Sequence, residues 1–147
     1  MILGLAAGKE EMIDIHSQRT ALRVASLITA LNVAVMCGFS IVGVLSPSAI
    51  LPPGASTTMA SEVFALYAAA RTVPLTLITL ATIGRKLWIL PLGMLAGVVQ
   101  LLDAGVGLFQ HDVGKTIGPL LIAVLQFLAL LNLTRSTGRS PASVLEH

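Results

Sequence analysis

The sequence predicts an all-α membrane protein, a bundle of four transmembrane helices with both termini on the cytoplasmic side. Three observations lead to this prediction. Charged residues make up only 11% of the 147 residues and hydrophobic residues 55%, whereas soluble globular domains carry roughly 25% charged residues. Four apolar stretches are long enough to cross a bilayer, and the basic residues gather on one side of them. The length suits a single domain.

The four apolar stretches are the predicted spans. A helix needs about 20 mostly apolar residues to cross a hydrocarbon layer of about 30 Å. The connections between the stretches carry helix-breaking residues, such as Pro52-Pro53-Gly54 after the first, Gly84 after the second and Gly114 after the third. We do not expect a cleavable signal peptide, because the apolar core of the first stretch is too long. The predicted spans cover residues 21–45, 62–83, 87–109 and 117–133.

The positions of lysine and arginine predict the orientation, because cytoplasmic loops carry an excess of both. Seven of the nine basic residues lie on one side: six fall before the first span, between the second and third, or after the fourth, and Arg23 lies at the very start of the first span. The opposite side carries only Lys115, and the ninth basic residue, Arg71, lies within a span. We therefore expect a multi-pass protein of the bacterial inner (plasma) membrane, with both termini and the turn at Gly84 in the cytoplasm.

The residues outside the four spans predict little structure. Residues 1–20 form a cytoplasmic arm, either an interfacial helix or a loosely ordered segment, and residues 21–134 form the membrane domain. Residues 135–147 are typical of a disordered tail, and its last three resemble the start of a vector-encoded polyhistidine tag. The single cysteine, Cys37, is expected to pack in an apolar run, and no Cys/His cluster predicts a metal site. The net charge of +2 is too small to argue for nucleic-acid binding.

Polar residues inside the predicted spans are the candidate site. A rise of about 1.5 Å per residue places Arg71 about 14 Å and Asp103 about 9 Å from the outer ends of their spans, close enough in depth for an ion pair. On the third span, small and polar residues from Gly93 to Gly107 share one face with Gln100 and Asp103, so that face should point inward. The residues expected to converge in the outer half of the bundle are Tyr67, Arg71, Gln100, Asp103 and Gln126, with Asn32 near mid-depth.

Two interpretations of these polar residues stay open. Arg71 and Asp103 could form a purely structural ion pair, with the amides joining helices. Alternatively, the residues line a polar pocket that opens toward the outer side. The second interpretation is favoured, because an ion pair alone stabilises a protein poorly and ionisable residues within a membrane usually serve a function.

Three short motifs resemble the DoxX-like group of small four-helix bacterial membrane proteins. They are Ala70-Arg71, Gln100-x-x-Asp103-x-Gly105 and Gly114-Lys115-x-x-Gly118-Pro119, and the resemblance extends from Arg19 to Leu133. It implies a membrane protein related to subunits of oxidoreductase systems that handle quinones or sulfur compounds. The group has no agreed catalytic residue to transfer to this chain. The absence of paired cysteines argues against a thiol-redox role.

The sequence therefore predicts a module that binds or helps to move a small amphiphile, such as a quinone, a fatty acid or a lipid fragment, and no other cofactor is evident. One alternative is an accessory subunit of an oxidoreductase or another membrane complex, in which the ion pair is structural. Another is an intramembrane enzyme with Asp103 as the acid or base. Tyr67 is then the only candidate for a second catalytic group. A non-enzymatic role is favoured. The lipid bilayer is the expected partner, and self-association or a larger membrane complex stays open.

Overall fold

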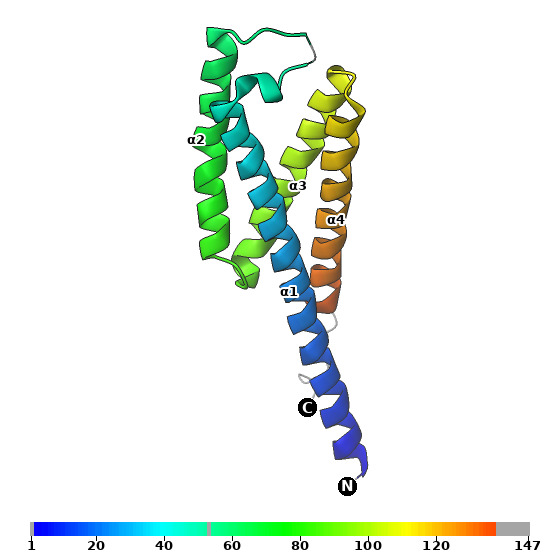
Figure 1. The fold of residues 1–147 in the computed structure, drawn as a ribbon. Coiled ribbons are helices and arrows are strands. Elements are labelled where there is room, and N and C mark those ends of the chain that lie inside the picture. Colours follow the sequence, from blue (N-terminus) through cyan, green and yellow to red (C-terminus); the bar gives the residue numbers. More distant parts are fainter. Residues whose placement is uncertain (1, 53, 138–147) are drawn as a thin grey trace.

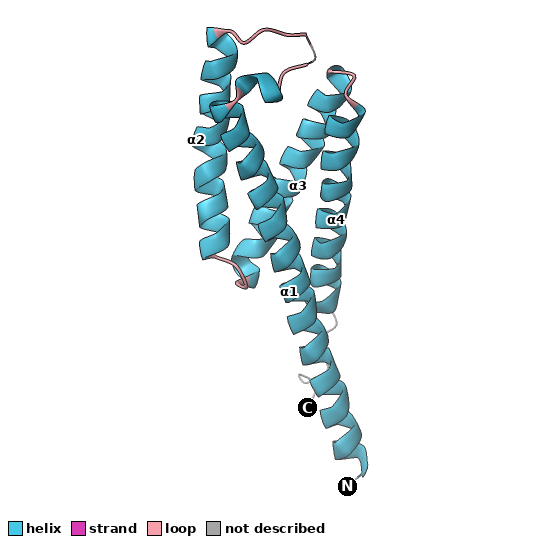
Figure 2. Cartoon of the chain, in the orientation of Figure 1, coloured by secondary structure: helices cyan, strands magenta, loops and turns pink. Residues whose placement is uncertain are grey.

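The computed structural model describes residues 2–52 and 54–137. Within these residues the chain forms four long α-helices and one short 3-10 helix, η1, at Pro47–Ala49 (Figure 2). Each long helix is apolar and long enough to cross a membrane, as the sequence predicted. The helices are α1 (Ile2–Leu45), α2 (Met59–Ala81), α3 (Lys86–Phe109) and α4 (Val113–Thr137).

Helices α2 and α4 begin three or four residues before the predicted spans because polar residues cap them. At α2, the Thr58 side chain accepts a hydrogen bond of 3.2 Å from the Ser61 backbone, and Ser61 Oγ accepts one of 2.9 Å from the Thr58 backbone. This reciprocal pair satisfies two backbone N–H groups that the first helical turn leaves free. At α4, Asp112 Oδ1 accepts a hydrogen bond of 3.0 Å from the Lys115 backbone N–H. Hydropathy alone does not detect such polar starts.

Helix α1 is continuous through most of the segment predicted to be an arm. It begins at Ile2 and contains 44 residues, which corresponds to a length of about 66 Å. Its apolar span begins at Ile15, so the N-terminal part of the helix projects beyond the bundle (Figure 1). At the other terminus, α4 continues to Thr137. The rest of the predicted tail, including the tag-like end, lies outside the described residues.

The four helices are arranged as two hairpins, α1 with α2 and α3 with α4 (Figure 1). Helix α1 also packs against α3 and α4 and joins the hairpins, whereas α2 has few contacts with α3. The α2–α3 turn contains Gly84, whose φ of +78° is a conformation that glycine adopts without strain. The Gly84 N–H donates to Ser26 Oγ over 3.3 Å and so ties this turn to α1. We call this end of the bundle the Gly84 end, and the end with connections 46–58 and 110–112 the loop end.

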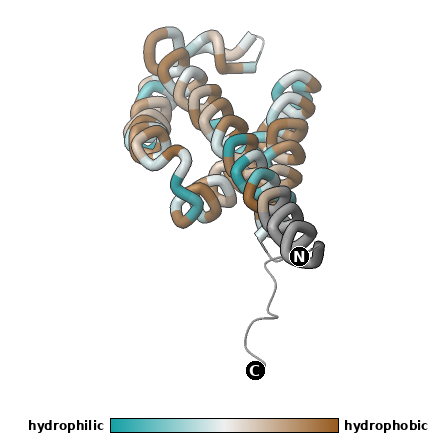
Figure 3. Tube along the Cα trace, turned by 90° about the horizontal axis from the view of Figure 1, so that it is seen from below, coloured by the Kyte–Doolittle hydropathy of each residue, from teal (hydrophilic) through white to brown (hydrophobic). Residues whose placement is uncertain are grey.

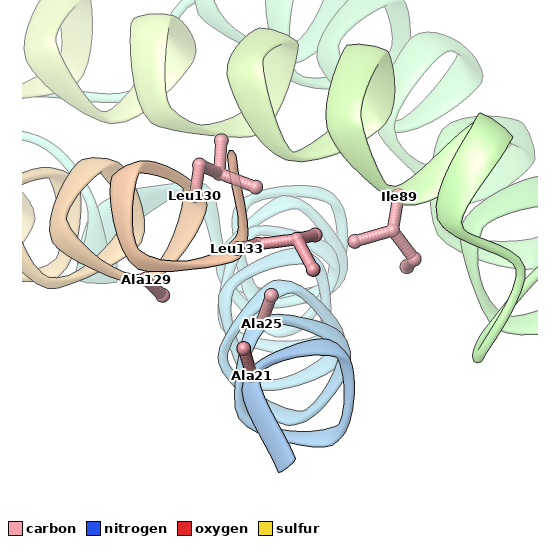
Figure 4. Packing of buried hydrophobic residues seen from close by; sticks show 6 residues of the cluster. All are labelled: Ala21, Ala25, Ile89, Ala129, Leu130 and Leu133. Carbon is pink, nitrogen blue, oxygen red and sulfur yellow. The ribbon is translucent and has the colours of Figure 1, made fainter. Parts of the chain in front are cut away.

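A cluster of buried apolar side chains lies toward the Gly84 end, between α1, α3 and α4. Ile89 of α3 and Leu133 of α4 are almost fully buried there, facing small residues of α1 (Figure 4). The predicted inward face of α3 is largely confirmed, since six of its seven buried residues are among those predicted. They are Gly93, Ala96, Gly97, Gln100, Ala104 and Gly107.

Large apolar side chains cover the outside of the bundle. Leu27, Phe64, Leu102 and Leu128, one from each helix, are all more than half exposed. Figure 3 shows hydrophobic residues along all four helices. A soluble monomer rarely exposes so much contiguous apolar surface. Together with the length of the helices, this surface is the one expected of a multi-pass membrane protein.

Candidate ligand-binding cavity and buried amide chain

A cavity of about 760 Å³ lies between the two hairpins, toward the loop end. All four long helices and Ile50 line it, and most of its wall is apolar. Pockets of this kind, apolar with a few convergent polar groups, are typical of small-molecule sites. Its polar lining residues are Ser40, Arg71, Thr72, Gln100, Asp103, Gln110 and Lys115.

The cavity is open on one side. Arg71 on α2 and Asp103 on α3 are exposed, and Val106, also on its wall, is 54% exposed. Helices α2 and α3 make few contacts with each other, and they diverge from the Gly84 turn toward the loop end (Figure 1). The side opening therefore lies along these two helices.

Arg71 and Asp103 face the same cavity but do not form the expected ion pair. Among the described residues, the single ion pair joins Lys115 and Asp112, and no hydrogen bond involves Arg71 or Asp103. The expectation rested on similar depths along two helices. Depth says nothing about lateral distance, and α2 and α3 lie apart at this level of the bundle. Both charged side chains are consequently left available on the cavity wall.

Tyr67 lies outside the cavity, contrary to expectation, and is 59% exposed. The buried face of α2 is defined by Ala65, Thr76 and Thr79. At about 100° per residue, Arg71 lies roughly 100° from the middle of that face, and Tyr67 a further 40° away. The long Arg71 side chain reaches the cavity from there, whereas Tyr67 points away from the bundle.

Three of the predicted site residues form a buried hydrogen-bonded chain. Gln100 Nε2 donates to Asn32 Oδ1 over 2.7 Å, and Asn32 Nδ2 donates to Gln126 Oε1 over 3.3 Å. The chain continues past these residues, because Gln126 Nε2 donates to Thr29 Oγ1 over 2.8 Å. All four side chains are at least 98% buried. Of these four, only Gln100 also lines the cavity. Apart from Tyr67, the predicted site residues therefore form two groups that meet at Gln100: Arg71 and Asp103 on the cavity wall, and the buried amide chain.

Thr29 was not predicted to be part of the site. Its hydroxyl donates to the Ala25 carbonyl over 2.7 Å, a common arrangement within a helix. The signal that could have identified it is spacing, since Thr29 precedes Asn32 by one helical turn and must share its face. Gly93 provides the space for this contact, because a Cβ there would lie 2.7 Å from Gln126 Nε2 and 3.1 Å from Thr29 Oγ1.

Lys115 closes the loop end of the cavity and was also missed as a site residue. Its Nζ donates to the Ile50 carbonyl over 2.9 Å and to Gln110 Oε1 over 3.2 Å, and lies 3.4 Å from Asp112 Oδ2. These contacts join the α1–α2 connection to the α3–α4 turn. The pKa of Asp112 is lowered, chiefly by the hydrogen bond from the Lys115 backbone N–H and further by the Lys115 side chain.

Comparisons with protein-family models, curated proteins and solved structures give no match to this chain. The functional conclusion therefore rests on the cavity and on the residues around it.

Proposed function

We propose that the protein binds a small amphiphile in the cavity between its hairpins, with the polar head of the ligand between Arg71 and Asp103. The observation that carries this proposal is the cavity of about 760 Å³ with both charged residues on its wall and neither paired with the other. An unpaired charge within a bilayer costs roughly 2.5–3.5 kcal/mol on insertion scales. A polar ligand group offsets part of that cost. The apolar wall accommodates the tail.

The proposal places the loop end of the bundle on the outer side of a bacterial inner membrane. The basic residues supply the argument, since Arg85 and Lys86 lie at the Gly84 end and Lys115 at the loop end. A ligand then enters from the outer leaflet, through the opening along α2 and α3. The resemblance to the DoxX-like group adds quinones to the candidate ligands, together with fatty acids and lipid fragments.

Binding is favoured over catalysis by the chemistry of the lining. Asp103 is the one acidic side chain among the lining residues, and none of them is a histidine, cysteine or tyrosine. Asp103 alone supplies neither a nucleophile with its base nor an acid–base pair. The alternative of a purely structural ion pair in an accessory subunit loses support, because Arg71 and Asp103 do not contact each other.

Native mass spectrometry of protein purified in a mild detergent tests the proposal. We expect a small molecule to remain bound to the wild type and to be lost from Arg71→Leu/Asp103→Leu. Ala68→Trp should also weaken binding, because the indole obstructs part of the cavity without changing any charge. Arg135→Leu is the matched control, since Arg135 is an exposed arginine of α4 that does not line the cavity. Wild-type protein that carries no ligand, and takes up none of the candidate amphiphiles when incubated with them, would overturn the proposal.

A further inference from the structure

Gln100 is the point at which the buried amide chain reaches the cavity. Its side chain is 98% buried, and its Nε2 is engaged with Asn32 Oδ1. No hydrogen bond to its other polar atom, Oε1, is formed by the described residues, and Gln100 lines the cavity. Which amide atom faces the ligand therefore depends on the direction of the hydrogen bonds along the chain.

The direction of the hydrogen bonds along this amide chain can be followed from Thr29 at its far end. The Thr29 hydroxyl has one hydrogen, and it donates that hydrogen to the Ala25 carbonyl, which can only accept. Thr29 Oγ1 can then only accept from Gln126, so Gln126 must present its NH₂ group there and its Oε1 to Asn32. Asn32 must in turn present its NH₂ group to Gln126 and its Oδ1 to Gln100.

It follows that Gln100 Oε1, a hydrogen-bond acceptor, is the open end of the chain. Reversing any one amide would place two donors or two acceptors against each other in a buried site, at a cost of about 1–3 kcal/mol. The oxygen and nitrogen positions of the three amides are thus consistent with one another and with the hydrogen bond from Thr29 to the Ala25 carbonyl. Asp103, one helical turn along α3, adds a carboxyl group to the same wall.

The two hydroxyl groups on the cavity wall are acceptors as well. Ser40 Oγ donates its hydrogen to the Met36 carbonyl over 3.0 Å, and Thr72 Oγ1 donates to the Ala68 carbonyl over 2.8 Å. Each hydroxyl thus offers only lone pairs to a ligand. At the loop end, Lys115 already has three acceptors for its three hydrogens. Among the lining residues, the Arg71 guanidinium and the Gln110 amide nitrogen form no hydrogen bond within the described part of the chain and can donate to a ligand.

We infer that the ligand is an amphiphile whose head group carries both an N–H-bearing ammonium and an anion, as an ethanolamine phosphate does. The ammonium lies against Gln100 Oε1 and Asp103 on α3, and the anion lies against Arg71 on α2. This inference rests on the proposed function and narrows it. Quinones and fatty acids satisfy Arg71 but bring no donor to the acceptors of the α1 and α3 wall.

The decisive comparison uses two lysolipids with the same acyl chain. Lysophosphatidylethanolamine has an ammonium with three N–H donors, whereas lysophosphatidylcholine has the same net charge and no N–H. We expect the first to bind about tenfold more tightly or better, because hydrogen bonds to charged groups are the stronger ones. Binding is measured by native mass spectrometry of the wild type in a neutral detergent. Dodecanoic acid, lysophosphatidylglycerol and a short-chain quinone complete the set, and all three should bind more weakly than lysophosphatidylethanolamine.

A substitution at Thr29, which does not line the cavity, tests the direction of the hydrogen bonds along the amide chain without changing the cavity wall. Thr29→Val removes the acceptor that orients Gln126, so Gln100 can present either amide atom to the ligand. The ratio of the affinities for lysophosphatidylethanolamine and lysophosphatidylcholine should therefore fall toward one. Thr79→Val is the matched control: Thr79 is equally buried and donates to its own helix over 2.8 Å, but within the described residues it forms no hydrogen bond with an Asn or Gln side chain. It should keep the preference. Asp103→Asn should weaken binding of the ethanolamine lipid more than that of the choline lipid.

The possible outcomes separate the inference from the proposed function. Equal binding of the two lysolipids, or tighter binding of dodecanoic acid, the quinone or lysophosphatidylglycerol, would overturn the inference and leave amphiphile binding in place. A preference that Thr29→Val and Asp103→Asn both leave unchanged would also overturn it. If none of the five amphiphiles binds to the wild type, the proposed function fails with it.

Discussion

Gln126 of α4 donates a hydrogen bond of 2.8 Å to Thr29 Oγ1 of α1 at the point where Gly93 of α3 carries no side chain. Three helices thus meet at one buried polar contact. The contact requires the small residue, because a Cβ on Gly93 would lie 2.7 Å from Gln126 Nε2 and 3.0 Å from a methyl group of Leu130. Small residues that let membrane helices approach closely are here used within one chain.

Gly93→Ala should destabilise the bundle by about 1–3 kcal/mol, the usual cost of an added methyl group in a filled interior. Gly105→Ala on the same helix is the control, because nothing lies within 4 Å of a Cβ there. The control should be neutral or stabilising by up to about 1 kcal/mol, since alanine favours a helix more than glycine does. Thermal unfolding in detergent measures both. Equal melting temperatures for the two variants would contradict the close contact.

Asn32→Leu should lower stability, because it leaves Gln100 Nε2 and Gln126 Oε1 without partners in a buried site. A stranded buried polar group costs about 1–3 kcal/mol, although hydrogen bonds between membrane helices average nearer 0.6 kcal/mol. Asn132→Leu makes the same replacement at an exposed position of α4 and should change the melting temperature little. If Asn132→Leu were the more harmful of the two, the amide chain would not be a stabilising element.

Arg71→Ala and Asp103→Ala should have nearly additive effects on stability when no ligand is bound. Residues that do not interact are additive to within about 0.5 kcal/mol, and these two form neither an ion pair nor a hydrogen bond with each other. The double-mutant cycle is measured by thermal unfolding of delipidated protein. A coupling of several kcal/mol, as expected for a buried ion pair that loses one partner, would contradict the arrangement described here.

The contribution of Asp112 to stability should decrease in acid. Its pKa is lowered in the folded protein, first by the hydrogen bond from the Lys115 backbone. A lowered folded-state pKa means that the ionised group stabilises the fold above its unfolded pKa, and that this contribution disappears as the pH falls through the folded pKa. The melting temperature of the wild type should therefore approach that of Asp112→Asn between neutral pH and about pH 3. A difference that stays constant over this range would contradict the prediction.

Cysteine accessibility tests the orientation. In a Cys37→Ala background, Ser56→Cys in the loop-end connection should react with a membrane-impermeant thiol reagent added to intact cells. Ser17→Cys, close to Ile15 where the apolar span of α1 begins, should react only after the cells are opened. Both serines are exposed in the fold, and neither change alters the charge bias on which the orientation rests. The opposite labelling pattern would invert the topology and place the cavity in the inner leaflet.

The sequence predicted the features that depend on one helix at a time. The four spans follow from length and hydropathy, and the inward face of α3 follows from a period of 3.6 residues. Features that depend on two helices were predicted less well. The expected ion pair between Arg71 and Asp103 failed because similar depth does not imply contact when α2 and α3 diverge. Asn32 and Gln126 were identified as inward residues, but their pairing was not.

The residues that the sequence did not identify have ordinary side chains in unusual contacts. Thr29 donates to its own helix, as many threonines do. It belongs to the site only because Gln126 of another helix lies where it can donate to Thr29 Oγ1. The sequence identified Lys115 as the basic residue of the outer side and as part of a short motif, but not as a residue of the site. Its contact with the Ile50 carbonyl joins the first turn of α4 to the α1–α2 connection, 65 residues away in sequence, and no local pattern encodes that contact.

The side-chain bonds of the amide chain all cross from one hairpin to the other. Thr29 and Asn32 belong to the α1–α2 hairpin, and Gln100 and Gln126 to the α3–α4 hairpin. Neither hairpin can satisfy these groups alone, and apolar surfaces do not choose between registers within lipid. Sliding one hairpin by a single turn, about 5.4 Å, would keep apolar surface against apolar surface but would separate each amide from its partner. The amide chain therefore favours one register of the α1–α2 hairpin against the α3–α4 hairpin.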